Sequence, residues 1–164
     1  MRPGTTADLT TVSATTGSTQ LTGWLLLAML AVTTLIPYAL GHRGWLPGPW
    51  RVRPLLQRLG PHYWLGYGLL GATLVHASLP MGTGEATEAN KTGLYLATGA
   101  WLLSIGQAIV GHRLRNPQLQ GRRDQRAWHV RLMVGIGLLT TGHIALNGTA
   151  AQRLAAMLIA KREG

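Results

Sequence analysis

The chain has 164 residues, of which 46% are hydrophobic and only 12% are charged, and its formal net charge is +10. Soluble domains usually contain about a quarter charged residues, so this composition indicates a membrane protein. The absence of cysteine excludes disulfides, iron–sulfur ligation and thiolate chemistry. The positive residues form two blocks between apolar runs, which is typical of a membrane topology signal and not of a nucleic-acid-binding face.

The chain begins with a polar segment and continues with four apolar stretches. Residues 1–20 are rich in Thr, Ser and Gly and lack the pattern of a signal peptide, so we expect a flexible tail there. Each apolar stretch has the roughly 20 residues that a helix needs to cross a bilayer. The sequence therefore predicts an all-α fold, an integral membrane four-helix bundle over residues 21–148, with its spans at Leu21–Leu40, His62–Met81, Thr92–His112 and Trp128–Gly148.

The connections between these stretches differ in charge. Arginines are concentrated in Gly41–Pro61 and Arg113–Ala127, whereas Gly82–Lys91 has one lysine and two glutamates. Positive loops stay in the cytoplasm, so we expect both termini outside, as in a protein of the bacterial inner membrane. Residues 149–164 are predicted to form a short amphipathic tail at the lipid surface, with Leu154, Met157 and Leu158 on one face.

Four of the six histidines form two equally spaced pairs. His62 and His76 lie 14 residues apart on the second predicted span, and His129 and His143 lie 14 apart on the fourth. Fourteen residues complete nearly four helical turns and advance roughly 21 Å, so both members of a pair share a face, one near each side of the membrane. The two spans run in the same direction, which brings His62 level with His129 and His76 level with His143.

Two facing imidazoles can bind one haem iron from opposite sides, and helical bundles build such sites from facing helices. The sequence thus predicts two haem b groups, an inner one held by His62 and His129 and an outer one held by His76 and His143. Iron with nitrogen on both faces suits electron transfer. A histidine in a membrane span can also be a satisfied polar group or a helix contact. Zinc or copper transport would require carboxylate, cysteine or closely spaced histidine ligands, and the chain lacks such a cluster.

The chain also contains an internal repeat. Gly41-His42-Arg43 ends the first span and Gly111-His112-Arg113 ends the third, an offset of 70 residues, while the haem histidines repeat at 67. Each unit is predicted to be a helical hairpin, so the bundle consists of two pseudo-repeated hairpins. His42 and His112 are interpreted as interfacial residues, with contacts to haem propionates or to a quinone as the alternative.

Haem propionates require positive partners, because burying an unpaired carboxylate is costly. Arg58, Arg126 and Arg131 lie within about a turn of His62 or His129 and are predicted to pair with the inner propionates. Lys91 and Arg153 are the nearest candidates for the outer haem. Gly66, one turn from His62, is small enough to let a macrocycle approach.

His62 and His76, with His129 and His143, resemble the ligand pattern of diheme membrane cytochromes b, over roughly Leu21 to Gly148. That group includes the cytochrome b of quinol–cytochrome c reductases and the ferric reductase-like transmembrane proteins. The resemblance implies two haems stacked across a four-helix bundle. The chain departs from both families, since it has neither a flavin and nicotinamide domain nor a recognisable quinol-site signature.

The predicted function is transmembrane electron transfer by a diheme cytochrome b that anchors a larger redox complex. Without a flavin, nicotinamide or iron–sulfur motif, such a chain is an electron-carrying subunit and not a complete enzyme. Its expected partners are membrane lipid and other subunits of that complex, with quinone as a candidate electron carrier, but no nucleic acid. The alternatives are a haem-free structural membrane subunit and a small transporter that uses its membrane histidines.

Overall fold

A computed structural model describes residues 6–42, 44, 46–83, 90–148 and 157, and the regular structure in these residues is entirely helical. Four helices are long, and two short ones lie in the connection between the first and second long helices. The bounds are α1 Thr6–Gly41, α2 Gly48–Arg51, α3 Leu55–Arg58, α4 Gly60–Thr83, α5 Lys91–Leu114 and α6 Arg122–Asn147. The all-α prediction is therefore confirmed for the described part of the chain.

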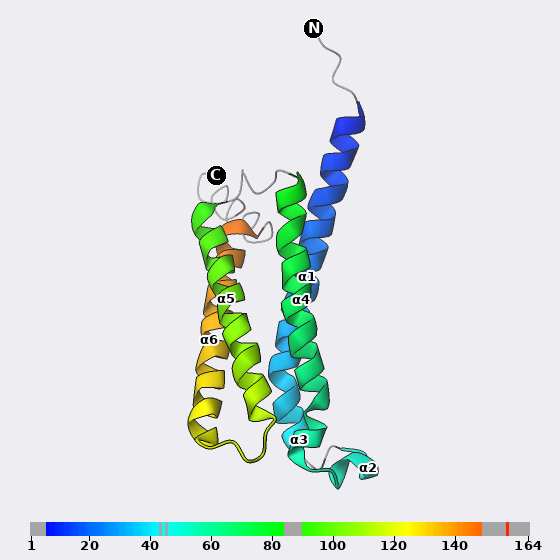
Figure 1. Ribbon diagram of the computed structural model, residues 1–164. Coiled ribbons are helices and arrows are strands. Elements are labelled where there is room, and N and C mark those ends of the chain that lie inside the picture. Colours follow the sequence, from blue (N-terminus) through cyan, green and yellow to red (C-terminus); the bar gives the residue numbers. More distant parts are fainter. Residues whose placement is uncertain (1–5, 43, 45, 84–89, 149–156, 158–164) are drawn as a thin grey trace.

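The long helices form two hairpins that stand side by side (Figure 1). Helix α1 packs along α4, and α5 packs along α6, while the hairpins meet mainly through α4 and α5. The α5–α6 turn ends at Gly121, whose φ of 65° lies in the left-handed region that glycine adopts without steric cost. Each half of the predicted repeat thus corresponds to one hairpin.

Three helices are long and apolar enough to cross a membrane, namely Thr19–Gly41 within α1, α5 and α6. The remaining predicted span coincides with α4, which has 24 residues and no Asp, Glu, Lys or Arg. Helix α4 is not among the helices whose most apolar stretch is sufficient to cross a membrane. Three of the four predicted spans are thus supported by length and composition.

The surface of the helices is strongly apolar. The buried hydrophobic core of the described residues is small and consists of Ala100, Leu114 and Ile136, whereas Leu35, Trp64 and Leu138 are 63%, 75% and 70% exposed. Continuous exposed apolar surface of this kind is costly in water but not in hydrocarbon, where helices pack without a large hydrophobic core. Burial and composition therefore agree on a membrane protein.

The ends of the chain differ from the predictions or lie beyond the description. Helix α1 begins at Thr6, so most of the segment expected to be a flexible tail is helical. Extending an existing helix costs far less than starting one, so the apolar span can continue into this Thr- and Ser-rich segment despite its modest helix propensity. The predicted amphipathic tail, 149–164, and with it Arg153, lies outside the described residues apart from Met157.

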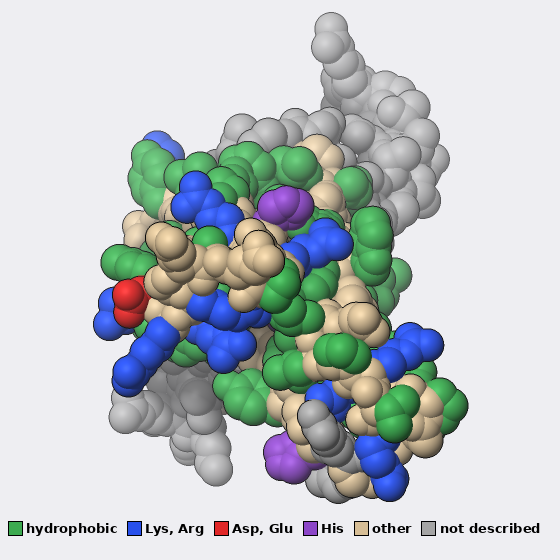
Figure 2. All heavy atoms as spheres, turned by 60° about the horizontal axis from the view of Figure 1, so that its bottom comes forward, with side chains coloured by type: hydrophobic (Ala, Val, Ile, Leu, Met, Phe, Trp, Pro, Cys, Tyr) green, Lys and Arg blue, Asp and Glu red, His purple; other side chains and the backbone are tan. Residues whose placement is uncertain are grey.

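Arginines gather at one end of the two hairpins. Figure 2 shows this end with α2, α3 and the α5–α6 turn turned forward, and Lys and Arg side chains are spread across it. The first turn of α6 contributes one acidic residue there, Asp124. We call this the basic end. Helix α1 starts and α6 finishes at the opposite end (Figure 1), so the described helices place both predicted cytoplasmic loops together.

Candidate functional site

A cavity of about 550 Å³ lies between the two hairpins, toward the basic end. It is bordered by all four long helices, and His62 from α4 and His129 from α6 both line it, with their rings in edge contact. Cofactor sites in proteins have volumes of about 300–1,000 Å³ and occur between the helices of bundles. The cavity therefore has the size and position expected for a bound prosthetic group.

The spacing of the inner pair agrees with shared ligation. The ring centres of His62 and His129 are 6.1 Å apart, and the ring planes meet at 76°. Two imidazoles bound on opposite sides of one metal ion, each about 2 Å from it, have ring centres about 6 Å apart. The helices thus bring together two residues that are far apart in sequence, at the separation that two axial ligands require.

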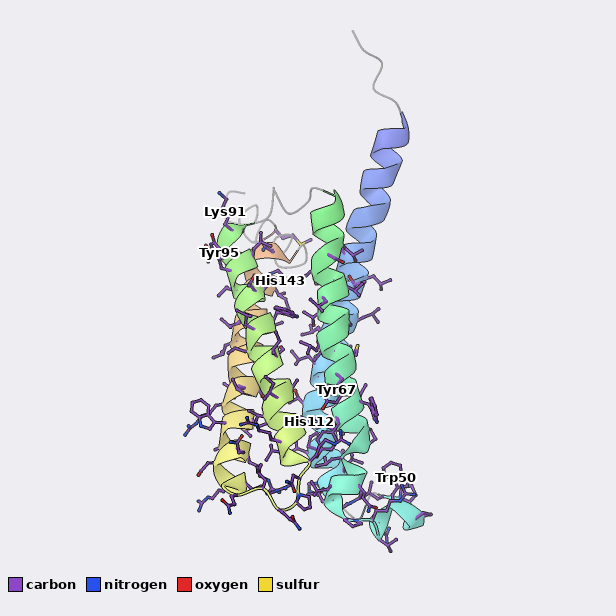
Figure 3. The ribbon with its side chains drawn as sticks, viewed as in Figure 1. Trp50, Tyr67, Lys91, Tyr95, His112 and His143 are labelled. Carbon is purple, nitrogen blue, oxygen red and sulfur yellow. The ribbon has the colours of Figure 1, made fainter. Side chains whose placement is uncertain are left out.

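The outer pair, His76 and His143, lies on α4 and α6, within electrostatic range of one another. Figure 3 shows His143 near the end of the molecule that carries Lys91, whereas Tyr67 and His112 lie near the basic end. All four paired histidines are half-buried, whereas His42 and His112 are exposed. The structure therefore separates the four predicted ligands from the other two histidines.

Three of these four imidazoles are oriented by a hydrogen bond at Nδ1. The Nδ1–H of His62 donates to the Thr33 carbonyl, and that of His143 donates to the Gly93 carbonyl, each at 2.9 Å. The Thr22 hydroxyl donates to the Thr19 carbonyl at 3.0 Å, so its oxygen accepts from His76 Nδ1–H at 2.9 Å. In these tautomers Nε2 keeps its lone pair, which is the form that binds a metal.

His129 is the exception. Its Nε2 lies 3.4 Å from the Gln107 side-chain nitrogen, while its Nδ1 is buried without a hydrogen-bond partner, as is the Gln107 side-chain oxygen. Gly111 adjoins the ring and leaves space for it, because a Cβ there would meet the His129 Cε1 at 3.2 Å. Binding through Nε2 therefore requires His129 to leave Gln107, whose free oxygen is then available to accept the Nδ1–H.

In each hairpin the first helix supports the histidines of the second. Helix α1 supplies Thr22 and Thr33 to α4, and α5 supplies Gly93 and Gln107 to α6. The spacing of the histidines does not predict these hydrogen-bond partners. Thr22 and Thr33 are 11 residues apart, about three helical turns, so one face of α1 presents both.

The three arginines predicted to contact propionates lie in different surroundings. Arg126 lines the cavity together with His62 and His129, and so does Arg122, which the prediction did not include. Arg131 is exposed, with its guanidinium 5.3 Å from the centre of the Trp128 ring. Arg58 is 2% exposed, and its Nη1 donates to the Leu40 carbonyl at 2.6 Å, where it caps the end of α1.

His42 and His112, predicted as interfacial residues or as propionate or quinone contacts, also differ from one another. The His42 Nδ1–H donates to the Tyr38 carbonyl of its own helix at 2.9 Å. His112 lines the cavity, and a hydrogen bond of 2.9 Å joins its Nδ1 to the Tyr67 hydroxyl across the contact between the hairpins. His112 is thus the one of the two that lies at the cavity.

The glycines supply the space that a flat group requires. Gly66 lines the cavity, and no atom lies within 4 Å of the position that its Cβ would occupy. Among the described residues, no three His, Cys, Asp or Glu side chains form a multi-ligand metal site. The paired imidazoles of His62 with His129 and of His76 with His143 are the donors that would hold haem, and these residues fit that group.

Comparisons with protein-family models, with curated protein sequences and with solved structures gave no match.

Proposed function

We propose that the chain is a diheme b-type cytochrome subunit whose four long helices form a membrane bundle, and that it carries electrons across the bilayer. The observation that carries the proposal is the inner pair, in which His62 and His129 face each other with ring centres 6.1 Å apart beside a cavity of about 550 Å³. The resemblance of the four histidines to the diheme cytochrome b pattern supports the same assignment.

The inner haem would be held by His62 and His129, and the outer haem by His76 and His143. When bound, each haem would supply one-electron chemistry. The protein's part is to hold each imidazole in the tautomer that leaves Nε2 free. The hydrogen bonds from His62, His76 and His143 to α1 and α5 serve that purpose.

Two haems level with the two ends of the helices would form an electron path along the membrane normal. With the basic end in the cytoplasm, as the positive-inside rule requires, the inner haem is near the cytoplasm and the outer haem near the opposite side. The donor and acceptor would then be other subunits of a redox complex or a quinone. His112 and Tyr67 line the cavity beside the inner pair and would be available to hydrogen-bond a quinone.

The test is the haem content of the purified full-length chain. A pyridine haemochrome assay should give two haems b per chain, and the reduced-minus-oxidised spectrum should be that of low-spin bis-histidine iron. One haem per chain would contradict the assignment of one of the pairs. A folded chain without haem would instead support the alternative, a structural membrane subunit.

The cavity arginines should influence the inner haem. Changing Arg126 to Gln should lower its midpoint potential, because loss of a nearby positive charge favours ferric iron. A unit charge about 8 Å away contributes about 2 kcal/mol at an effective dielectric constant of about 20, and water around the exposed guanidinium reduces this. We expect a roughly threefold change in the equilibrium constant, or about 30 mV for one electron.

The matched control for this measurement is Arg131→Gln. Arg131 lies five residues further along the same helix, but it stacks on Trp128 and does not line the cavity. A redox titration should therefore find the inner haem's potential lowered in the Arg126 variant and nearly unchanged in the Arg131 variant. A lowered potential in the Arg131 variant and an unchanged one in the Arg126 variant would instead indicate that Arg131 pairs with the propionate, as its proximity to His129 in the sequence predicts.

A further inference from the structure

The start of α5 and the end of α6 are joined by a reciprocal pair of asparagines. The Asn90 backbone N–H donates to the Asn147 side-chain oxygen at 2.8 Å, and the Asn147 side-chain nitrogen donates to the Asn90 carbonyl at 3.2 Å. Both hydrogen bonds link residues that are 57 positions apart in sequence. One amide side chain therefore satisfies both backbone groups of Asn90 and fixes the two helix ends relative to each other.

The pair continues to an outer haem ligand through Gly93. The Asn90 side-chain oxygen accepts from the Gly93 N–H at 3.2 Å and so caps the start of α5. The Gly93 carbonyl accepts from His143 Nδ1–H at 2.9 Å. His143 lies four residues before Asn147 on α6, so the hydrogen bonds form a closed ring between the two helices. We call Asn90, Gly93 and Asn147 the asparagine clamp.

The clamp requires glycine at position 93. Gly93 is buried, and a Cβ there would collide with the amide group of Asn147. The close approach therefore depends on the missing side chain and not on backbone conformation. The other α6 histidine has no such support, because His129 Nδ1 is buried without a partner. The two α6 histidines thus differ in how firmly their rings are held.

We infer that the asparagine clamp positions His143 and thereby sets the potential of the outer haem. The inference rests on the proposed function. A firmly held carbonyl acceptor at Nδ1–H makes the imidazole a stronger electron donor through Nε2, which favours ferric iron and lowers the midpoint potential. The clamp residues are positioning residues, since they act through His143 and not on the iron. Loosening the clamp lets the Gly93 carbonyl move away from His143 and raises the potential.

The test uses the full-length haem-loaded chain and measures both midpoint potentials. Asn147→Ala removes both hydrogen bonds to Asn90 and should shift the ferric–ferrous equilibrium of the outer haem roughly threefold to tenfold toward the ferrous form, or about 30 to 59 mV upward for one electron. The inner haem's potential should remain unchanged. Asn116→Ala is the matched control, because Asn116 accepts a hydrogen bond from Gln118 N–H in the α5–α6 turn and makes no contact with the paired histidines.

A second variant distinguishes positioning from simple closure of the hairpin. Asn147→Leu keeps the size of the side chain and loses both hydrogen bonds to Asn90 without adding a charge, so it should raise the outer potential as Asn147→Ala does. Gly93→Ala should also raise it, and the double variant with Asn147→Ala should show a smaller effect than the sum, since both changes break one network.

Two results would overturn the inference. One is an unchanged outer potential in both Asn147 variants with two haems bound, which leaves the diheme assignment intact. The other is an equal shift of both haems, which would mean that the asparagines only close the hairpin. The wild-type chain without haem would instead contradict the proposed function itself, so the two failures are distinguishable. If Asn147→Ala does not accumulate, the outer potential of Asn147→Leu decides the question.

Discussion

Replacing His76 or His143 with leucine is expected to remove the outer haem completely and to leave the inner haem in place. On the proposed assignment each of these histidines would supply one of the two nitrogens that hold the iron, and leucine has no donor atom. The inner pair lies roughly 21 Å away along the helices, as 14 residues at 1.5 Å each require, so its ring contact with a spacing of 6.1 Å is not disturbed. The pyridine haemochrome value should therefore fall from two haems per chain to one.

The potential of the haem that a variant retains shows which pair of histidines holds which haem. A redox titration of either outer variant should show one component with the wild-type potential of the inner haem. His62→Leu or His129→Leu should instead leave one component with the wild-type potential of the outer haem. His42→Leu is the control, since His42 is exposed, does not line the cavity, and its Nδ1–H donates to the Tyr38 carbonyl, and it should retain both haems. Loss of both haems from an outer variant would mean that the sites depend on one another for folding, and loss from His42→Leu would contradict the ligand assignment.

The helices, and which histidines share a face of one helix, could be predicted from the sequence because both depend on periodicity along one helix. A spacing of 14 residues fixes which side chains share a face, whatever surrounds the helix. Charge in the loops likewise predicts which ends lie together. The start of α1 could not be predicted in this way, because residues 6–20 have no apolar pattern, and their helix continues from the neighbouring span.

The contacts between helices could not be predicted from spacing, since they depend on how each helix is rotated against its neighbour. Arg131 shows the limit of sequence proximity. It is two residues from His129, which places it on the other side of the helix, where it meets Trp128. Arg126 is three residues from His129 and shares its face, so it reaches the cavity. Arg58 is four residues from His62, but α3 ends between them, and Arg58 turns back to α1.

The residues that hydrogen-bond to the four histidines could not be predicted, for the same reason. Thr22, Thr33, Gly93 and Gln107 are ordinary residues for apolar helices, and only the packing of α1 on α4 and of α5 on α6 brings them to the histidines. Gly93 permits the close approach of Asn147, whereas Gly66 lines the cavity as expected.

Filling the space beside Gly66 is expected to abolish binding of the inner haem without disturbing the outer one. Gly66 borders the cavity, and nothing lies within 4 Å of its Cβ position, so leucine can be accommodated by the protein alone. Its four additional carbon atoms would then project into the space that a flat group needs. We expect Gly66→Leu to bind one haem per chain by pyridine haemochrome and to retain the outer haem's potential.

Gly71→Leu is a close control because it repeats the same chemical change on the same helix. Gly71 also has no atom within 4 Å of its Cβ position, but it is exposed and does not line the cavity. Leucine favours a helix over glycine by up to about 1 kcal/mol at either position, so any effect on helix stability is shared. Two haems in Gly71→Leu and one in Gly66→Leu would place the inner haem in the cavity, whereas two haems in both variants would show that it binds elsewhere.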